Sequence, residues 1–223
     1  RRHLPDVVVI DDGSAKPGRD AVAALGAAGL AHVVHRQSNG GKGAAVKTGF
    51  EHARSLGFTH ALQLDADGQH DIERIPAFLD AARASPTALV LGHPEYDAAA
   101  PRGRRIARKI TIFWVNIETW GKKITDPMIG FRVYPLADVD VARRCGDRMD
   151  FDIEVAVRLA WRRLPIINLP VAVRYLSAAE GGVSHFRMFR DNVRISWLHT
   201  RLTTISIFLG LGRAFRRLFG GRS

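Results

Sequence analysis

Short apolar runs alternate with helical patterns from the start of the chain to Gly92. Each run is rich in β-branched residues or leucine, ends in polar or glycine residues, and predicts a buried strand. The predicted strands are residues 6–10, 31–35, 60–65 and 87–92. The predicted helices are residues 19–30, a segment that follows a glycine-rich loop and ends near Gly57, and residues 71–84. This alternation indicates βαβ units and a mainly parallel α/β sheet.

The pattern changes after Gly92. A loop containing proline and alanine, at residues 93–101, is expected to lead into a basic helix at about 103–119. A short strand, two helices, an apolar run and a basic, apolar tail are expected next. These segments are residues 130–135, about 136 onward, about 151–163, 166–175 and 184–223. We interpret the chain as one α/β domain over residues 1–183 with C-terminal helices over 184–223.

Composition narrows the class of protein. With 46% hydrophobic and 25% charged residues over 223 positions, the chain can bury a sizeable core. Its net charge of +11 favours polyanionic partners such as nucleic acid, nucleotide diphosphates or an anionic membrane surface. The lone Cys145 excludes an internal disulfide and is expected to be a buried, inert thiol. No stretch approaches the roughly 18 apolar residues needed to cross a bilayer.

Two acids and an amide follow the third predicted strand directly, in ALQLDADGQHD (61–71). Side chains alternate along a strand, so Asp65 and Asp67 point the same way at its carboxyl end, where open α/β sheets bind ligands. Two carboxylates held together favour a divalent cation. Mg²⁺ and Mn²⁺ take such oxygen ligands, to which Gln69 can add an amide oxygen.

Two other interpretations of this stretch are a calcium loop and a polar turn. A calcium loop beginning at Asp65 needs glycine at its sixth position and glutamate at its twelfth, where the chain has His70 and Pro76. That count excludes the calcium loop. A polar turn would cap the next helix, with Asp71 as N-cap and Glu73 in the first turn.

The glycine-rich stretch NGGKGAAVKTG (39–49) matches neither common nucleotide-binding fingerprint. A P-loop needs Ser or Thr where Gly43 stands, and a dinucleotide fingerprint needs glycine where Val46 stands. Backbone N–H groups and Lys42 at a helix start can still cradle a diphosphate. A plain loop is the alternative.

Six stretches, taken in order, resemble one enzyme family. They are VVVIDDGS (7–14), NGGKGAAVKTG (39–49), LDADGQH (64–70), DPMIGFRVYP (126–135), FDIEVAVRLAWRRLP (151–165) and GGVSHFR (181–187). Together they resemble the GT-A nucleotide-sugar domain of family 2 glycosyltransferases. Within it they are most similar to the branch of dolichyl-phosphate mannosyltransferase and bacterial polyprenyl-phosphate glycosyltransferases. The resemblance runs from about Asp6 to about Trp197.

The resemblance implies a GT-A fold and a metal-dependent, inverting transfer from a UDP- or GDP-sugar. It implies that Asp65, Asp67 and Gln69 hold Mg²⁺ or Mn²⁺ on the donor diphosphate. The nucleotide-sugar-binding residues that it implies are Asp11, Asp12, Lys42 and Asp65. The family's domain also begins with a strand and a helix that are expected upstream of residue 1.

The predicted helix at 103–119 has an apolar and a basic face. The apolar residues that share one face by their spacing are Ile106, Ile110, Phe113 and Ile117. Arg104 and Arg108 lie nearly opposite, either as a solvated charged face or, as the family branch implies, as a clamp on an acceptor phosphate. In GGVSHFR, His185 stands where the family has lysine, and His185 and Arg187 are both candidates for phosphate contact in this loop.

Three residues are candidates for catalysis. Asp126 opens the DPMIGF turn. Aspartate before proline is common in turns, so a purely structural role is one interpretation. The resemblance makes Asp126 a candidate for acceptor orientation or base catalysis. Arg132 lies on a short apolar strand beside that turn, which favours a function. Glu154 is the other candidate base, although Arg158 four residues on favours a surface ion pair instead.

The tail indicates where the protein works. Its apolar positions at helical spacing are Phe186, Phe189, Val193 and Trp197, and its neighbouring arginines are Arg187, Arg190, Arg194 and Arg201. Such a helix fits the membrane interface. Packing onto the catalytic domain is the alternative.

The sequence as a whole predicts a peripheral glycosyltransferase at the cytoplasmic face of a membrane. Its partners are expected to be a nucleotide-diphosphate sugar donor, a lipid-linked acceptor such as polyprenyl phosphate, and the membrane surface, with no nucleic acid. A sugar-phosphate nucleotidyltransferase and a basic nucleic-acid-binding α/β module are the alternatives. The nucleic-acid module predicts a recognition motif that the sequence does not contain.

Overall fold

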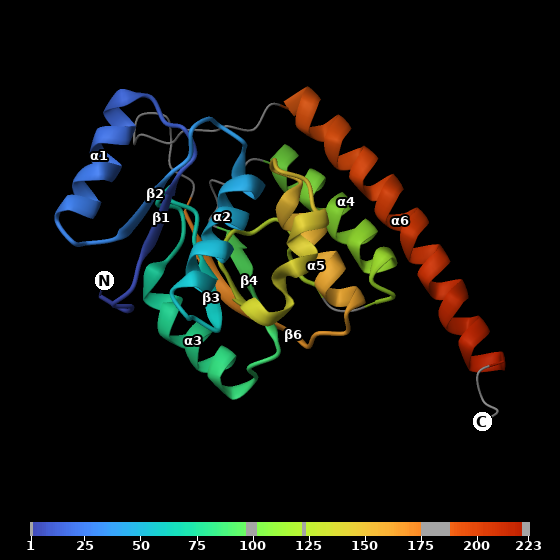
Figure 1. Ribbon diagram of the computed structural model, residues 1–223. Helices are drawn as coiled ribbons and strands as arrows, with labels where there is room; N and C mark the ends of the chain where they lie inside the picture. Colours follow the sequence, from blue (N-terminus) through green and yellow to red (C-terminus); the bar gives the residue numbers. More distant parts are fainter. Residues whose placement is uncertain (1, 97–101, 122–123, 175–187, 220–223) are drawn as a thin grey trace.

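A computed structural model describes residues 2–96, 102–121, 124–174 and 188–219 (Figure 1). The strands of this part of the chain form two sheets. The smaller sheet is a parallel pair of β1 (Val8–Asp11) and β2 (His32–His35).

The larger sheet has the strand order β3-β5-β4-β6. These strands are β3 (His60–Gln63), β5 (Arg132–Pro135), β4 (Leu89–Tyr96) and β6 (Ile166–Val173). β5 runs antiparallel to both of its neighbours, whereas β4 and β6 are parallel. Since β3, β4 and β6 all run in one direction, the prediction of a mainly parallel sheet is confirmed. β4 continues into the segment expected to be a loop, because residues 93–96 pair with residues 170–173.

The helices follow the predicted order with two local differences. The helices of the sheet domain are α1 (Lys16–Ala27), α2 (Lys42–Ser55), α3 (Ile75–Ala84) and α5 (Phe151–Trp161). A 3-10 turn, η1 (Ile72–Arg74), precedes α3, and Asp71 Oδ1 caps it by accepting from Glu73 N at 3.0 Å, as predicted. The helix expected from about 136 is the 3-10 helix η2 (Leu136–Arg144), whose β-branched and aspartate residues disfavour a regular α-helix.

Helix α2 packs against strands of both sheets, β1 and β3. These two strands are not hydrogen-bonded to each other in the described part of the chain, so each has one edge without a neighbouring strand there. The strand and helix expected upstream of residue 1 stay a prediction.

Two clusters of buried side chains form the core. The larger one surrounds α5, which is buried along nearly its whole length, and it includes Cys145. Burial raises the pKa of the Cys145 thiol to about 12, which agrees with the expected inert thiol. The smaller cluster lies between α3 and the larger sheet, where the rings of Phe78 and Phe131 are 4.3 Å apart.

Helices α4 (Arg102–Glu118) and α6 (Met188–Phe219) lie side by side along one side of the molecule (Figure 1). Leu198 and Leu202 of α6 are fully buried, and His199 Nδ1 lies 2.8 Å from Glu118 Oε1 of α4. The tail therefore packs onto the catalytic domain, the alternative that the sequence left open, and does so as one helix. In the part of the chain that the structure describes, α6 and the other helices are too short or too polar to span a bilayer.

Candidate active site

The acidic loop after β3 carries the predicted metal ligands. Asp65 is partly buried and Asp67 is exposed. Asp67 Oδ1 accepts a hydrogen bond from Gln69 N at 3.1 Å, and Gln69 O accepts one from Arg174 N at 2.9 Å, which ties the loop to the end of β6. These two carboxylates and one amide are oxygen donors that suit Mg²⁺ or Mn²⁺. The described residues contain no group of three or more His, Cys, Asp or Glu side chains that could hold a metal ion, so a cation here needs Gln69 or substrate phosphates as further ligands.

Lys42 joins the glycine-rich loop to the acidic loop. It is the first residue of α2 and follows Gly41, whose φ of 101° is readily available only to glycine. Lys42 Nζ lies 2.7 Å from Asp65 Oδ2 and 2.6 Å from Asp152 Oδ2. Burial opposes the charge, but the two carboxylates outweigh burial and raise the pKa of Lys42. The predicted donor site therefore contains a charged ammonium group on a side chain that is 18% exposed.

Asp152 is a site residue that sequence reasoning missed. It lies in the first turn of α5, is almost fully buried, and its Oδ1 accepts from Gln63 Nε2 at 3.2 Å. Burial favours the neutral acid, but Lys42 and Arg132 lower the pKa of Asp152 overall. The stretch FDIEVAVRLAWRRLP drew attention to Glu154, because helical spacing gave Glu154 a visible partner. No spacing rule connects Asp152 with a lysine so distant in sequence.

Asp12 of the DDGS turn holds the glycine-rich loop in place. Its Oδ1 accepts from Gly40 N at 3.0 Å and its Oδ2 accepts from Gly41 N at 2.7 Å. Arg36 Nη1 pairs with the same carboxylate at 2.6 Å. The observed contacts of Asp12 therefore shape the loop that begins with Asn39, and its predicted contact with a nucleoside stays a prediction.

Asp11 is buried beside the same loop. Its Oδ1 accepts from Ser14 N at 2.9 Å, and its Oδ2 lies 2.8 Å from His35 Nδ1. Hydrogen bonds from Ser14, and then from His35, lower the pKa of Asp11 to about 2. The carboxylate is ionised at neutral pH and fixes the turn after β1, while its predicted contact with the donor is untested.

The DPMIGF turn brings a further acid, Asp126, to this region. Asp126 is buried, and its Oδ1 accepts from two backbone N–H groups of its own turn at 2.8 and 3.0 Å. Its Oδ2 lies 2.8 Å from Arg108 Nε of α4. A Cβ atom added to Gly130 would overlap the Asp65 carboxylate, so the turn packs directly on the acidic loop. The structure thus packs the turn that carries Asp126, the partner of Arg108, against Asp65 of the acidic loop.

Arg132 lies on β5 and is fully buried. Its Nε donates to Ile129 O at 2.6 Å, its Nη2 to Pro127 O at 2.7 Å and its Nη1 to Asp152 O at 2.7 Å. These carbonyl groups belong to the DPMIGF turn and to the first turn of α5. The observed contacts therefore position two parts of the site, and the predicted catalytic role of Arg132 stays a prediction.

Glu154 lies in a different buried cluster. Its Oε1 pairs with Arg158 at 2.7 Å, the ion pair that helical spacing predicted, but Glu154 is fully buried and not at the surface as expected. Its Oε2 pairs with Arg201 of α6 at 2.7 Å and accepts from Gly146 N at 3.0 Å. The structure therefore joins Glu154 to α6 and does not bring it to Asp65.

The predicted acceptor-phosphate residues are described only in part. Arg108 is on α4, with Asp126 as its partner. Arg104 belongs to the same helix, but its side chain lies outside the described part of the chain. His185 and Arg187 also lie outside the described residues.

His70 is a second group that was not predicted as a site residue. Its ring stacks on Phe131 with centroids 5.9 Å apart and an interplanar angle of 17°, and its buried Nδ1 has no hydrogen-bond partner in the described part. Burial lowers the pKa of His70, which the charges of Asp65 and Asp67 partly oppose. A neutral imidazole therefore lies next to the acidic loop, and its place in LDADGQH was the only signal.

A model of glycosyl transferase family 2 matches residues 3–140. The chain belongs to this family. The match confirms the resemblance and makes the chain a glycosyltransferase, against the nucleotidyltransferase alternative. The polyprenol monophosphomannose synthase of Mycolicibacterium smegmatis is 29% identical over 197 residues, which cover 84% of this chain and 72% of that protein. The undecaprenyl-phosphate mannosyltransferase of Micrococcus luteus is 28% identical over 178 residues, which cover 74% of this chain and 70% of that protein.

The fold agrees with that of solved glycosyltransferases. The glucosyl-3-phosphoglycerate synthase of Mycobacterium tuberculosis, in complex with Mn²⁺, UDP-glucose and phosphoglyceric acid, matches with a TM-score of 0.51 at 18% identity. The match covers 78% of this chain and 62% of that chain, so this chain spans less than two thirds of its length. The GT-A fold predicted from the sequence is confirmed.

Proposed function

We propose that this family 2 glycosyltransferase transfers a sugar, with mannose as the first candidate, from a UDP- or GDP-sugar to a polyprenyl phosphate. The convergence of Asp65, Lys42 and the Asp126–Arg108 pair at one edge of the sheet carries the proposal. It provides ligands for a cation, a cation for the donor and a guanidinium for the acceptor. The names of the two relatives both join mannose to a polyprenyl carrier, which supports the choice of sugar and acceptor.

The donor half is built from the acidic loop and the start of α2. Asp65, Asp67 and Gln69 would hold Mg²⁺ or Mn²⁺, which would neutralise charge on the leaving diphosphate. Lys42 lies on the same side and would offer its ammonium group to the diphosphate from between Asp65 and Asp152. Lys42 keeps its charge at neutral pH because of its two carboxylate partners.

The acceptor half needs orientation more than a strong base. A phosphate oxygen attacks the anomeric carbon from the face opposite the diphosphate. The new carbon–oxygen bond forms as the old one breaks, and the nucleoside diphosphate leaves with the bonding electrons, which inverts the configuration. Because the acceptor phosphate is already ionised, no proton has to be removed, and the guanidinium of Arg108 is suited to hold the phosphate beside Asp126.

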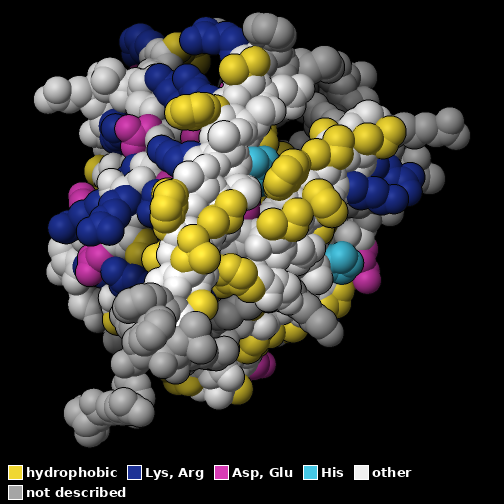
Figure 2. All heavy atoms as spheres, turned by 90° about the vertical axis from the view of Figure 1, so that its right-hand side faces the viewer, with side chains coloured by type: hydrophobic (Ala, Val, Ile, Leu, Met, Phe, Trp, Pro, Cys, Tyr) yellow, Lys and Arg dark blue, Asp and Glu magenta, His cyan; other side chains and the backbone are white. Residues whose placement is uncertain are grey.

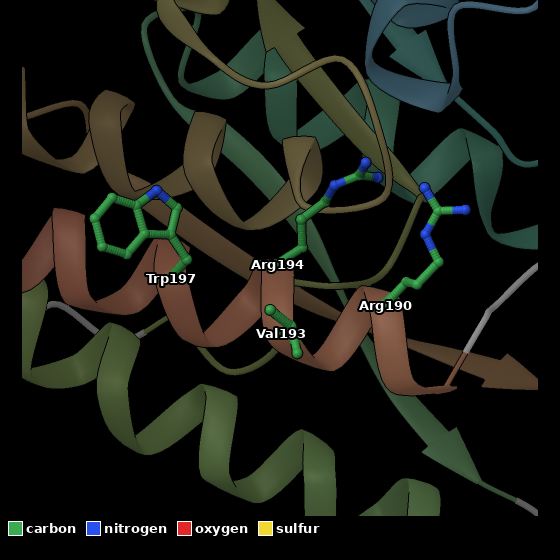
Figure 3. A pocket seen from close by; sticks show the side chains of 4 residues that line it. All are labelled: Arg190, Val193, Arg194 and Trp197. Carbon is green, nitrogen blue, oxygen red and sulfur yellow. The ribbon is translucent and has the colours of Figure 1, made fainter.

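The outer face of α4 and α6 supports a membrane partner (Figure 2). This outer face consists of exposed apolar residues of both helices: Ile106, Ile110, Phe113, Ile117, Val193, Trp197, Ile207, Phe208 and Leu211. The exposed basic residues on the same two helices include Arg105, Lys109, Arg190 and Arg194. Arg190, Val193, Arg194 and Trp197 line an open hollow of about 340 Å³ along α6 (Figure 3).

An anionic bilayer surface fits this outer face better than a second copy of the chain. A two-fold contact would place arginines and lysines of one copy against those of the other, because Glu118 and Asp191, the acids of these two helices that the structure describes, are buried. Anionic lipid complements the same charges while the apolar side chains enter the interface. This arrangement would hold the enzyme on the membrane surface, where we propose that it works from the cytoplasmic side.

The proposal is tested by transfer of labelled sugar into lipid. Wild-type protein and Asp67→Ala are incubated with a panel of UDP- and GDP-sugars, Mn²⁺ and a membrane lipid extract, and label in the organic phase is counted. We expect label there only with wild type and only with metal. Wild-type protein that moves no label from any donor, and hydrolyses none, would contradict the proposal.

A further inference from the structure

We infer that Asp152 is a positioning residue of the donor site, which keeps Lys42 in place when a divalent cation occupies the oxygens of Asp65. The inference rests on the proposed function, because it assigns Asp152 a part in binding a nucleotide-sugar donor. Neither the metal-binding pair in LDADGQH nor the resemblance to the family assigned this residue.

The first step of the inference is competition for Asp65. Lys42 Nζ lies 2.7 Å from Asp65 Oδ2, so Lys42 occupies one of the two oxygens that Asp65 can offer a metal ion. A metal ion and an ammonium group repel each other when they share one carboxylate. Lys42 therefore needs a second counter-charge if it is to remain buried beside the metal.

Asp152 supplies that second counter-charge. Its Oδ2 lies 2.6 Å from Lys42 Nζ, and its side chain is 3% exposed. When Asp65 turns to a metal ion, Lys42 can keep this ion pair and stay at the donor site. Without Asp152, the binding of a cation would leave a buried ammonium group unpaired, which is strongly unfavourable.

A closed ring of hydrogen bonds fixes Asp152. Gln63 Nε2 donates to Asp152 Oδ1 at 3.2 Å, and Gln63 Oε1 accepts from Tyr134 OH at 3.0 Å. Arg132 Nη1 donates to Tyr134 OH at 3.3 Å and to Asp152 O at 2.7 Å. The ring joins β3, β5 and α5, so the carboxylate has little freedom to follow Lys42 elsewhere.

Arg132 extends this ring to the acceptor half. Its other nitrogens donate to the carbonyl oxygens of Pro127 and Ile129, in the turn that carries Asp126. One buried arginine thus holds both the residue that pairs with Lys42 and the turn that pairs with Arg108. The positions of the two halves are coupled through it.

An acid in the first turn of a helix can also serve only to stabilise that helix. In Asp152, however, both carboxylate oxygens face side chains of other elements, Lys42 of α2 and Gln63 of β3. A helix-stabilising role predicts that replacing Asp152 changes stability alone. The positioning role predicts a change in metal binding that depends on Lys42.

Mn²⁺ binding separates these roles without any turnover. Free Mn²⁺ is measured by electron paramagnetic resonance in titrations of wild type, Asp152→Asn and the double variant Lys42→Met/Asp152→Asn. We expect Asp152→Asn to weaken Mn²⁺ binding about 10- to 100-fold, because Lys42 then has only Asp65 as partner. The double variant has no competing ammonium group, and we expect its affinity to return to within about threefold of wild type.

Donor binding completes the test. Calorimetric titration with the panel of UDP- and GDP-sugars should show weaker binding to Lys42→Met, and adding Asp152→Asn to that variant should change the affinity by less than about twofold. The matched control is Asp147→Asn, since Asp147 pairs with Lys47 of α2 at 2.8 Å but is mostly exposed. This control should bind like wild type.

Four results overturn the inference, and they can be told apart. Unchanged Mn²⁺ binding in Asp152→Asn, or a double variant as weak as Asp152→Asn, overturns it alone. The inference is also overturned if Asp152→Asn and Lys42→Met lower donor affinity independently, so that their losses add in the double variant. Wild-type protein that binds no nucleotide sugar overturns the proposed function as well. If Asp152→Asn does not fold, the donor affinities of Lys42→Met and of the double variant can still be compared, because the double variant has no charged group at either position.

Discussion

The two faces of α4 differ in a way that is unusual for a helix at the edge of a domain. Toward the site, Arg108 pairs with the buried Asp126 at 2.8 Å. Away from the site, Ile106, Ile110 and Phe113 are 61%, 55% and 59% exposed. A surface helix normally buries its apolar stripe and exposes its charges. Here the apolar stripe is exposed, which agrees with the membrane contact that we propose for this outer face.

This difference separates two tasks. The charged side of α4 belongs to a network that is complete within the folded chain, from Arg108 through the DPMIGF turn to Arg132. The apolar side lacks such partners in the described part of the chain. We therefore expect changes to the site to affect chemistry at unchanged membrane binding, and changes to the outer face to do the reverse.

The largest effect is expected at the site. Asp65→Asn keeps the shape of the side chain but removes the charge that we propose binds the metal, and it weakens one partner of Lys42. We expect kcat/KM for transfer to fall by about 10³-fold or more, as the leaving diphosphate loses its cation. Flotation with anionic liposomes should remain that of wild type. Activity within tenfold of wild type would show that the acidic loop does not hold the metal.

The next effect concerns the outer face. Replacing Ile110, Phe113 and Trp197 with serine removes three exposed apolar side chains, and we expect binding to anionic liposomes to weaken about 10- to 100-fold. Binding should also weaken with rising salt, since basic residues of the same helices contribute. Leu30→Ser, which removes a leucine that is 48% exposed outside α4 and α6, is the control. Equal flotation of all three proteins would refute a membrane role for the outer face.

A smaller effect is expected where the two regions meet. Glu154 is fully buried and joins Arg158 to Arg201 of α6. Glu154→Gln should lower the free energy of unfolding in urea by about 2 kcal/mol, less than for a fully buried pair because both arginines can regain water. Glu51→Gln, at an exposed position of α2, should change it by less than about 0.5 kcal/mol. A catalytic base would show the opposite pattern, with activity lost at unchanged stability.

The smallest effect concerns Cys145. Its thiol is buried, and burial raises its pKa to about 12, so the thiolate is scarce at pH 8. Folded protein should therefore react with a thiol reagent only on the timescale of unfolding, and at full rate in guanidinium chloride. Rapid reaction of the folded protein would show that the core around α5 opens far more readily than its packing indicates.

The position of the acidic loop could be predicted because its signal is local, while metal binding there stays a prediction. An apolar strand followed directly by Asp65 and Asp67 predicts two carboxylates at a ligand-binding edge. In the structure β3 ends at Gln63, so both aspartates lie in the loop after the strand and strand alternation does not orient them. Asp152 could not be predicted in this way, because its relation to Lys42 depends on how α5 packs against α2 and β3. The same holds for Arg132, whose placement on β5 was predicted but whose complete burial comes from the turn that folds over it.

The fold shows a similar division. The order of strands and helices followed from hydrophobic periodicity, and the antiparallel course of β5 between β3 and β4 did not, because pairing depends on contacts distant in sequence. The apolar stripe of α4 was identified correctly, but no periodicity reveals whether such a stripe faces the core or the outside. In the structure, α6 packs beside α4 and the apolar stripe of α4 stays exposed.

Calorimetric titration with UDP- and GDP-sugars, in the presence and absence of Mn²⁺, tests the central claim most directly. We predict that wild-type protein binds at least one of these donors, that Mn²⁺ strengthens the binding about tenfold or more, and that Asp67→Ala loses the gain from Mn²⁺. The same affinity with and without metal, or no binding to any donor, would contradict the account.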